Sequence, residues 1–181
     1  MIFRPTTIPG AFVIEIERLE DERGFFARTW CRDEFRAHGI EVDMVQASVS
    51  YNRKAGTLRG LHFSLPPSME GKLVRCARGR IHDVLLDLRP ASPSYRRHVS
   101  VTLDSRGHTA VYIPPGLAHG FQTLVDDCEV MYMMTDVYRA ESSAGVRFDD
   151  PAFGIEWPLE VTCIAERDRS YPLFSCSALA G

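Results

Sequence analysis

The sequence has few cysteines and places none of them in a pattern that binds a metal or builds a disulfide framework. The chain has 181 residues and five cysteines, with no CxxC pair: Cys31, Cys76, Cys128, Cys163 and Cys176. An odd number of scattered thiols is typical of a protein kept in a reducing compartment. We therefore expect reduced cysteines and a cytoplasmic protein.

Long apolar runs and a strong charge of either sign are also missing. No stretch approaches the roughly 20 apolar residues that a membrane-spanning helix needs. The first residues, Met1 to Pro5, lack the basic and apolar regions of a signal peptide. A formal net charge of −3 gives no general attraction for nucleic acid or for an anionic membrane. We expect neither partner, so any anion must be bound by local cations.

Composition and patterning predict one mainly β domain over residues 1–181. Hydrophobic residues make up 45% and charged residues 25%, as in ordinary globular proteins, and the sequence shows no repeat or linker. One short helix is predicted over residues 32–38, ending at Gly39. Polar turns at 104–107 and 126–127 predict two hairpins. The candidate strands cover residues 11–17, 25–30, 45–51, 58–63, 72–77, 81–88, 98–103, 110–113, 121–125 and 129–135. Many short strands with little helix favour a sandwich or a barrel.

Two of these strands, expected to be neighbours, carry charged or titratable side chains in apolar surroundings. Arg59 and His62 lie in the first strand and Lys72 in the second. An anion binder, a base and a second cation close together can bind a phosphorylated substrate and move a proton on it. Taken singly, His62 is more simply a packed residue and Lys72 a solvated charge on the outer face. No neighbour supplies a carboxylate to orient His62, so that partner has to come from elsewhere in the fold.

A second pattern is the Pro115-Gly116 turn followed by His119, which resembles the second half of the cupin signature. Metal-binding cupins also need an HxH pair, which is missing because His62 is followed by Phe63 and Ser64. His62, Glu70 and His119 could still supply the three ligands of a facial triad. A metal-dependent enzyme therefore stays open beside a tight turn with a packed histidine.

Several longer motifs, in order along nearly the whole chain, resemble those of the dTDP-4-dehydrorhamnose 3,5-epimerase family. They are Arg59–Phe63, Gly71–Arg75, Ile113–Phe121 and Asp149–Pro158, with Arg23–Phe26 before them and Asp168 followed by Pro172 after them. The resemblance implies a cupin-type double-stranded β-helix (jelly roll) with a few short helices. It also implies a homodimer and catalysis without metal or cofactor. Its subunits would exchange N-terminal segments, so that Arg23 and Phe26 complete the partner's site.

The resemblance further implies a substrate, a nucleotide-linked 4-keto-6-deoxy sugar. The protons on C3 and C5 lie beside the C4 ketone, so removing one gives an enolate, and returning a proton to the opposite face inverts the carbon. By this resemblance, His62 is the base and Asp168 its carboxylate partner. Tyr132 delivers the proton from the other face, and Lys72 holds the enolate oxygen.

Substrate binding would fall to a wider set of side chains. Arg59 and Arg23 would bind pyrophosphate, because guanidinium presents a rigid fork of donors. The other substrate-site residues implied are Phe26, Gln46, Ser48, His119, Tyr138 and Arg167. The most specific expectation is conversion of dTDP-4-dehydro-6-deoxy-D-glucose to dTDP-4-dehydro-L-rhamnose. An epimerase of C3 only or C5 only, the metal cupin and a non-catalytic sugar-nucleotide-binding cupin are the alternatives.

The sequence departs from the family pattern at several positions. They are Arg28, Ser48, Met133, Ser143, Ala144 and Arg167. All four residues implied in proton transfer are present, whereas the altered positions belong mainly to substrate holding or its surroundings. Proton transfer is therefore the firmer expectation, and the identity of the nucleotide the weaker one.

Overall fold

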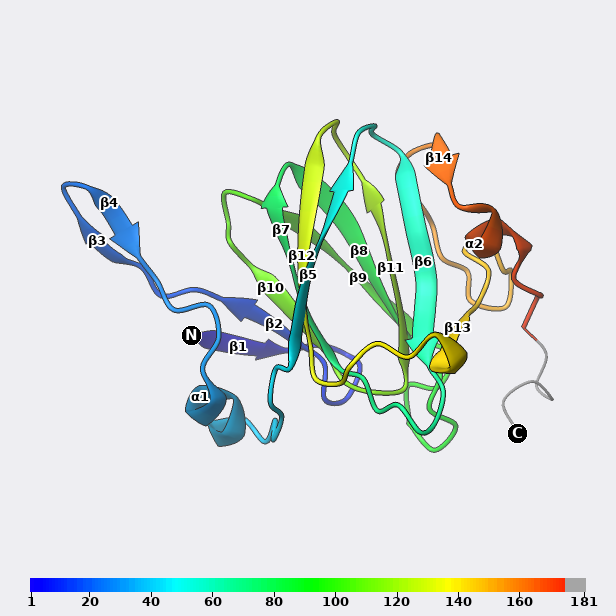
Figure 1. Cartoon of the computed structure of the whole chain (residues 1–181), viewed down its shortest axis with the longest axis horizontal. Coiled ribbons are helices and arrows are strands. Elements are labelled where there is room, and N and C mark those ends of the chain that lie inside the picture. Colours follow the sequence, from blue (N-terminus) through cyan, green and yellow to red (C-terminus); the bar gives the residue numbers. More distant parts are fainter. Residues whose placement is uncertain (175–181) are drawn as a thin grey trace.

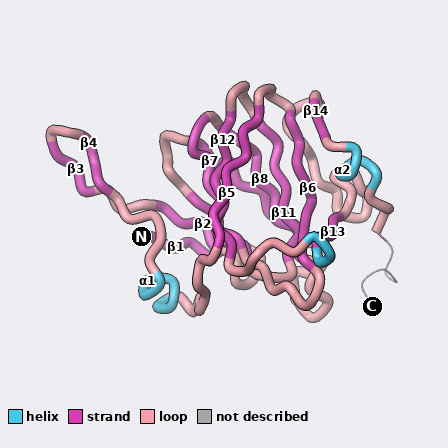
Figure 2. Tube along the Cα trace, viewed as in Figure 1, coloured by secondary structure: helices cyan, strands magenta, loops and turns pink. Residues whose placement is uncertain are grey.

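Two β-sheets face each other and make up most of the protein, in a computed structural model that describes residues 1–174 (Figure 1; Figure 2). The first sheet has the strand order β1-β2-β10-β7-β12-β5. Its strands are β1 (Ile2–Pro5), β2 (Phe12–Glu15), β5 (Gln46–Asn52), β7 (Lys72–Arg78), β10 (Ala110–Ile113) and β12 (Cys128–Met134). The second sheet has the order β13-β6-β11-β8-β9, with β14 beside β6. Its strands are β6 (Thr57–Ser64), β8 (Arg80–Asp87), β9 (His98–Asp104), β11 (Leu117–Thr123), β13 (Ser143–Gly145) and β14 (Cys163–Ile164).

Shorter elements surround this sandwich. Strands β3 (Leu19–Asp21) and β4 (Gly24–Phe26) form a hairpin that projects away from the two sheets (Figure 1). The helices are α1 (Arg32–Ala37), the 3-10 turn η1 (Ala140–Ser142) and α2 (Glu166–Ser170). The predicted helix is confirmed, and Gly39 follows it at a φ of 75°, a conformation that glycine adopts without a steric cost. The mainly β class and the cupin-type jelly roll are therefore as predicted.

The connections between strands differ from the sequence predictions. The turn at 104–107 joins β9 of the second sheet to β10 of the first, and the turn at 126–127 joins β11 to β12 in the same way. Neither is a hairpin, and β6 and β7 are not neighbours but lie in opposite sheets. Turn residues fix where a chain reverses. The sheet that the next strand joins depends on which of its faces is buried and against which strands. The residues of the turn carry no information on that choice.

The core lies between the sheets and fixes which way each strand faces. Its buried members include Val74 and Cys76 of β7, Leu85 of β8, Phe121 of β11 and Val130 of β12. Because side chains alternate along a strand, Lys72 shares the inner face with Val74 and Cys76. The prediction that Lys72 is a solvated charge on the outer face is therefore wrong.

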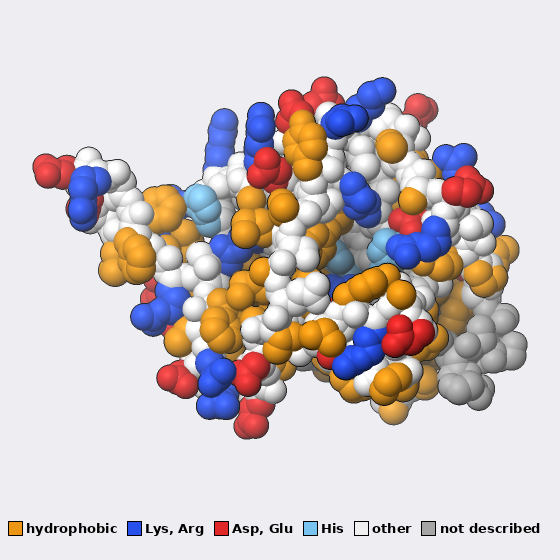
Figure 3. Space-filling model, in the orientation of Figure 1, with side chains coloured by type: hydrophobic (Ala, Val, Ile, Leu, Met, Phe, Trp, Pro, Cys, Tyr) orange, Lys and Arg blue, Asp and Glu red, His pale blue; other side chains and the backbone are white. Residues whose placement is uncertain are grey.

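Each outer face is covered over only part of its area. The segment from β13 onward packs Val146 and Phe153 on the second sheet, and α1 packs Phe35 on the first. The strip over β5 and β12 is uncovered, and hydrophobic side chains gather there (Figure 3). Its exposed apolar residues are Val49, Tyr51 and Met131.

Smaller sequence predictions have mixed outcomes. The strand predicted over 25–30 ends at Phe26, and the β11 strand begins at Leu117 rather than Phe121. The four described cysteines are free thiols, and Cys176 lies outside the described residues. No helix within residues 1–174 has both the length and the apolar character needed to cross a bilayer.

Candidate active site

Two histidines lie side by side on the inner face of the second sheet. His62 of β6 is the cross-strand partner of His119 of β11. Opposed residues on antiparallel strands point to the same side of the sheet. His119 packs near Phe121 of the core, which places both imidazoles on the inner side.

His62 is held by a carboxylate from the other end of the sequence. Its Nε2 lies 2.8 Å from Oδ1 of Asp168, which belongs to α2 and is only 2% exposed. The other oxygen of Asp168 accepts the Gly60 N–H at 3.1 Å. Burial alone would raise the pKa of Asp168, but the hydrogen bonds from His62 and Gly60 bring it below its ordinary value. The ionised carboxylate accepts the proton on Nε2, so Nδ1 is the nitrogen that can take up another. The partner that sequence reasoning expected from elsewhere in the fold is therefore in place.

Arg167 adds a cation to this pair. Its Nη2 lies 3.2 Å from Nε2 of His62, and its Nε lies 3.5 Å from Oδ1 of Asp168. Because Nε2 already carries the proton donated to Asp168, it cannot also accept a hydrogen bond from Arg167. The guanidinium therefore lies against the edge of the imidazole without a hydrogen bond to it. Arg167 therefore borders both members of the pair and presents positive charge at the site.

His119 has its own carboxylate, which sequence reasoning missed. Its Nε2 lies 2.8 Å from Oδ2 of Asp83, and the Asp83 side chain is fully buried. Asp83 lies on β8, one strand away from His119. The sequence signal is that two acids, Asp83 and Asp87, interrupt the mainly apolar run from Ile81 to Leu88, and such a signal does not say which side chain either acid meets.

Tyr132 faces the same space from the first sheet. It is the partner of Ser48 on β5 and of Val74 on β7, and its ring centroid lies 6.3 Å from that of His119. Burial raises the pKa of the phenol, the charge of Asp83 raises it further, and Arg59 acts in the opposite direction. The phenol is therefore protonated at neutral pH and able to give a proton.

Lys72 and Gln46 lie one row further along the first sheet. Both are cross-strand partners of Met134, so all three share the inner face. The Nζ of Lys72 lies 3.2 Å from Oε1 of Glu70, and its side chain is 17% exposed. The amide oxygen of Gln46 accepts the backbone N–H of Tyr138 at 3.0 Å, which brings Tyr138 to the edge of this row.

The three residues of the alternative metal triad are not assembled. No group of three or more His, Cys, Asp and Glu side chains within residues 1–174 is arranged to hold a metal ion. Glu70 is paired with Lys72, and both imidazoles give Nε2 to aspartates. His62, Glu70 and His119 therefore do not form the facial triad that the sequence left open.

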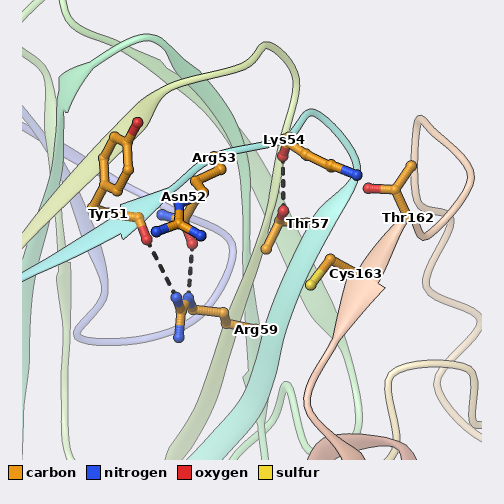
Figure 4. A pocket seen from close by; sticks show the side chains of 8 residues that line it. All are labelled: Tyr51, Asn52, Arg53, Lys54, Thr57, Arg59, Thr162 and Cys163. Atoms are coloured by element: carbon orange, nitrogen blue, oxygen red, sulfur yellow. Dashed lines mark hydrogen bonds between the residues drawn. The ribbon is translucent and has the colours of Figure 1, made fainter.

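A basic pocket opens between the ends of β5, β6 and β14 (Figure 4). It has a volume of about 450 Å³ and is lined by Tyr51, Asn52, Arg53, Lys54, Thr57, Arg59, Thr162 and Cys163. The Nε of Arg59 donates to Oδ1 of Asn52 at 2.7 Å, and its Nη2 donates to the Tyr51 carbonyl at 3.4 Å. A second hollow, lined by His62 and Asp168, also has Arg59 on its wall. An anion held by Arg59 can thus extend a neutral group toward His62.

Two predicted site residues lie apart from this space. Arg23 is in the projecting hairpin, pairs with Asp21 at 2.5 Å and has an 85% exposed side chain. Phe26 is 71% exposed and borders a surface hollow with Leu19 and Arg28. Neither reaches the histidines of its own chain.

The other departures from the family pattern have plain structural settings. Arg28 forms an ion pair at 2.9 Å with Glu34 of α1, which packs on the outer face of the first sheet. Met133 packs on the outer face of the first sheet. Ser143 and Ala144 lie on β13, beside the end of β6 that carries His62.

Comparison with known proteins gives a consistent result. A sequence model of the family described as dTDP-4-dehydrorhamnose 3,5-epimerase matches residues 5–175. The chain is 42% identical over 172 residues to the dTDP-4-dehydrorhamnose 3,5-epimerase of Methanothermobacter thermautotrophicus, covering 93% of this chain and 92% of that protein. It is similar to the Bacillus anthracis enzyme of the same name, solved with TDP and PPi bound, with a TM-score of 0.92 and 35% identity over 96% of this chain and 99% of that one. The Legionella pneumophila dTDP-6-deoxy-D-glucose-3,5-epimerase, solved in complex with dTDP-4-keto-L-rhamnose, gives a TM-score of 0.89 and 33% identity over 95% and 92%.

Proposed function

The chain belongs to the dTDP-4-dehydrorhamnose 3,5-epimerase family, and from this premise we propose that it converts dTDP-4-dehydro-6-deoxy-D-glucose to dTDP-4-dehydro-L-rhamnose. The reaction inverts C3 and C5 by removing and returning a proton beside the C4 ketone. The observation that carries the proposal is the pair formed by His62 and Asp168 on one sheet, with the protonated phenol of Tyr132 on the other. The Legionella relative holds a ligand of this chemical class, which supports the choice of substrate.

Each proton transfer has a donor and an acceptor. In the proposal, Nδ1 of His62 takes the proton from carbon, and Asp168 stabilises the imidazolium that results. The electron pair of the broken C–H bond moves into the enolate, whose oxygen is held by Lys72. The phenol of Tyr132 then protonates the opposite face of the carbon. After each inversion the imidazolium of His62 returns its proton to solvent and the phenolate of Tyr132 takes one up, so that the same set can act at C3 and at C5 in turn.

Substrate binding is assigned to the groups around these residues. Arg59 in the basic pocket binds the pyrophosphate, because its guanidinium is oriented by Asn52 and faces both hollows. The TDP and PPi in the Bacillus relative support a site for these groups. The residues assigned to the sugar and the base are Gln46, Ser48, His119, Tyr138 and Arg167.

We further propose that residues 1–181 form one domain and that the working unit is a homodimer. The β3–β4 hairpin presents Arg23 and Phe26 away from their own chain, where they can complete the site of a second copy. The uncovered apolar strip of Val49, Tyr51 and Met131 offers a surface for that copy. The free thiols of the described cysteines support a cytoplasmic location.

Incubation with dTDP-4-dehydro-6-deoxy-D-glucose in heavy water tests the function directly. Proton NMR should show loss of the C3 and C5 signals and new signals of the inverted sugar. Deuterium at only one carbon would make the protein a single-site epimerase. No deuterium at either carbon, with tight binding of the substrate, would leave a sugar-nucleotide-binding protein and overturn the proposal.

A further inference from the structure

The most costly polar group in the interior is the carboxylate of Asp83, to which neither the family resemblance nor the mechanism above gives a role. Its side chain is fully buried between the sheets, and among residues 1–174 its Oδ1 has no hydrogen-bond partner. A buried carboxylate is expensive unless it is paired and hydrogen-bonded. Its one polar contact is Nε2 of His119 at 2.8 Å. A carboxylate that is costly to bury and contacts one site residue is a candidate for a functional role.

We propose that Asp83 is a positioning residue for the protonation half of the reaction, because it fixes the tautomer and the orientation of His119 against Tyr132. This inference rests on the proposed function. It concerns only how the proton is delivered, and not how it is removed.

The two histidines are held in the same way from opposite directions. His62 gives its Nε2 to Asp168 of α2, and His119 gives its Nε2 to Asp83 of β8, both at 2.8 Å. When Nε2–H faces a carboxylate, the neutral imidazole carries its lone pair on Nδ1. Asp83 therefore makes Nδ1 of His119 an acceptor, suited to a sugar hydroxyl. Without this carboxylate the ring has no group to select that tautomer.

The orientation of the His119 ring also affects Tyr132, the proposed proton donor. Its ring packs edge-on against the ring of Tyr132, with an interplanar angle of 75° and a centroid distance of 6.3 Å. The groups that face His119 are His62 on β6, Asp83 on β8 and Tyr132 on β12. His119 is the aromatic ring that packs against Tyr132 in the described residues. The angle of the His119 ring therefore limits the positions that the phenol can take. A sugar bound to Nδ1 is then aligned with the hydroxyl of Tyr132.

The test compares Asp83→Asn with Asp168→Asn as a matched pair, using the full-length protein and dTDP-4-dehydro-6-deoxy-D-glucose in heavy water. Asparagine keeps the shape, but its amide can turn its NH₂ group to the ring and select the opposite tautomer. We expect Asp83→Asn to lower the rate of inversion roughly 10- to 100-fold, the loss typical when the hydrogen-bond partner of a metal-bound histidine is removed. Deuterium exchange with retention should fall less. Asp168→Asn should lower exchange and inversion together, because it disables the base.

Nitrogen NMR of His119 supplies a readout that a purely structural role would not change. In the unmodified protein the proton should reside on Nε2, and in Asp83→Asn it should move to Nδ1. A double variant with His119→Asn should be no slower than His119→Asn alone, since Asp83 acts through that ring. An unchanged ratio of inversion to exchange in a folded Asp83→Asn protein would overturn the inference. A lack of any exchange in the unmodified protein would instead overturn the proposed function.

Discussion

The proposed base and its carboxylate illustrate what single residues contribute, and how far apart they stand in the sequence. His62 and Asp168 are separated by 106 positions and meet at 2.8 Å. Above the ordinary pKa of an aspartate the carboxylate is ionised, and its lowered pKa keeps it so in mildly acidic solution. The pair is therefore intact throughout the neutral range.

Replacing His62 by alanine should abolish deuterium exchange at both C3 and C5. His119 also has a ring nitrogen oriented by a carboxylate, but in the proposal that nitrogen accepts a sugar hydroxyl, so it does not replace His62 as the base. Circular dichroism should show an unchanged fold, because the ring is partly exposed and outside the main core. Exchange at the unmodified rate in this variant would rule out His62 as the base.

Replacing Tyr132 by phenylalanine should lower the rate of inversion by about 10²- to 10⁴-fold, the range of a lost general acid. Substrate affinity, measured by titration calorimetry, should change little because the ring and its packing are retained. If affinity falls and the rate at saturation does not, Tyr132 is a binding contact and not the acid.

Sequence reasoning reached these residues unequally, for physical reasons. The motifs around His62, Lys72 and His119 identify side chains, because their neighbours in the chain are distinctive. Asp83 could not be identified, because its meeting with His119 depends on the register between β8 and β11. The neighbours of Lys72 alone predict a solvated side chain, because alternation along a strand shows two faces without saying which of them is the inner one.

At the scale of secondary-structure elements, sequence predicts where strands and turns lie but not which strands pair. Strand positions follow from composition and were mostly predicted, and the helix ending at Gly39 was correct. The two turns are placed correctly but are not hairpins, because the strand after each turn, β10 or β12, pairs with the distant strand β7 rather than with the strand before the turn. β1 was missed, since Pro5 and short length weaken its pattern.

The loop after β8 is held by a buried carboxylate. Asp87 accepts hydrogen bonds from Arg89, Ser92 and Ser94, which overcome the effect of burial and lower its pKa to about 2. A folded-state pKa below the ordinary 3.8 stabilises the fold. This stabilisation is complete above about pH 4 and disappears as the pH falls toward the lowered value.

Asp87→Asn should therefore lower the free energy of unfolding by about 2 kcal/mol at pH 7, and by less at pH 3. Urea unfolding at both pH values and one protein concentration measures this. Asp149→Asn is the control, because Asp149 forms an exposed pair with Arg147 and should cost less than about 1 kcal/mol. An equal loss at both pH values for Asp87→Asn would contradict the assignment.

At the scale of the whole molecule, the hairpin and the uncovered strip require a second copy in the proposal. Arg23 lies on an element that touches no part of its own site, so a monomer should lack one pyrophosphate contact. The strip includes Met131, which precedes Tyr132 on β12, and its partner Val49 on the neighbouring strand β5. Assembly and catalysis should therefore be linked.

Mixing two inactive variants tests this link. His62→Ala and Arg23→Ala subunits, unfolded together and refolded in equal amounts, should recover up to about a quarter of full activity, because half the dimers contain one intact site. Each variant alone, treated in the same way, is the control. No recovery in a mixture shown by mass spectrometry to contain heterodimers would exclude exchange of the hairpin.

Disrupting the strip should separate the copies. Val49→Glu with Met131→Glu places two carboxylates on the apolar surface, and light scattering should report a monomer. Lys54→Glu, on an exposed loop, controls for the charge change. A dimer that survives the double change would place the interface elsewhere.

The anchoring of the base by α2 has a consequence for protein synthesis. A ribosome has to translate past codon 168 before the imidazole made more than a hundred codons earlier acquires its carboxylate. A fragment that ends between residues 164 and 167 contains every described strand of both sheets, yet it carries a histidine without its carboxylate. If His62 is the base as proposed, only chains translated through α2 can act on the activated sugar.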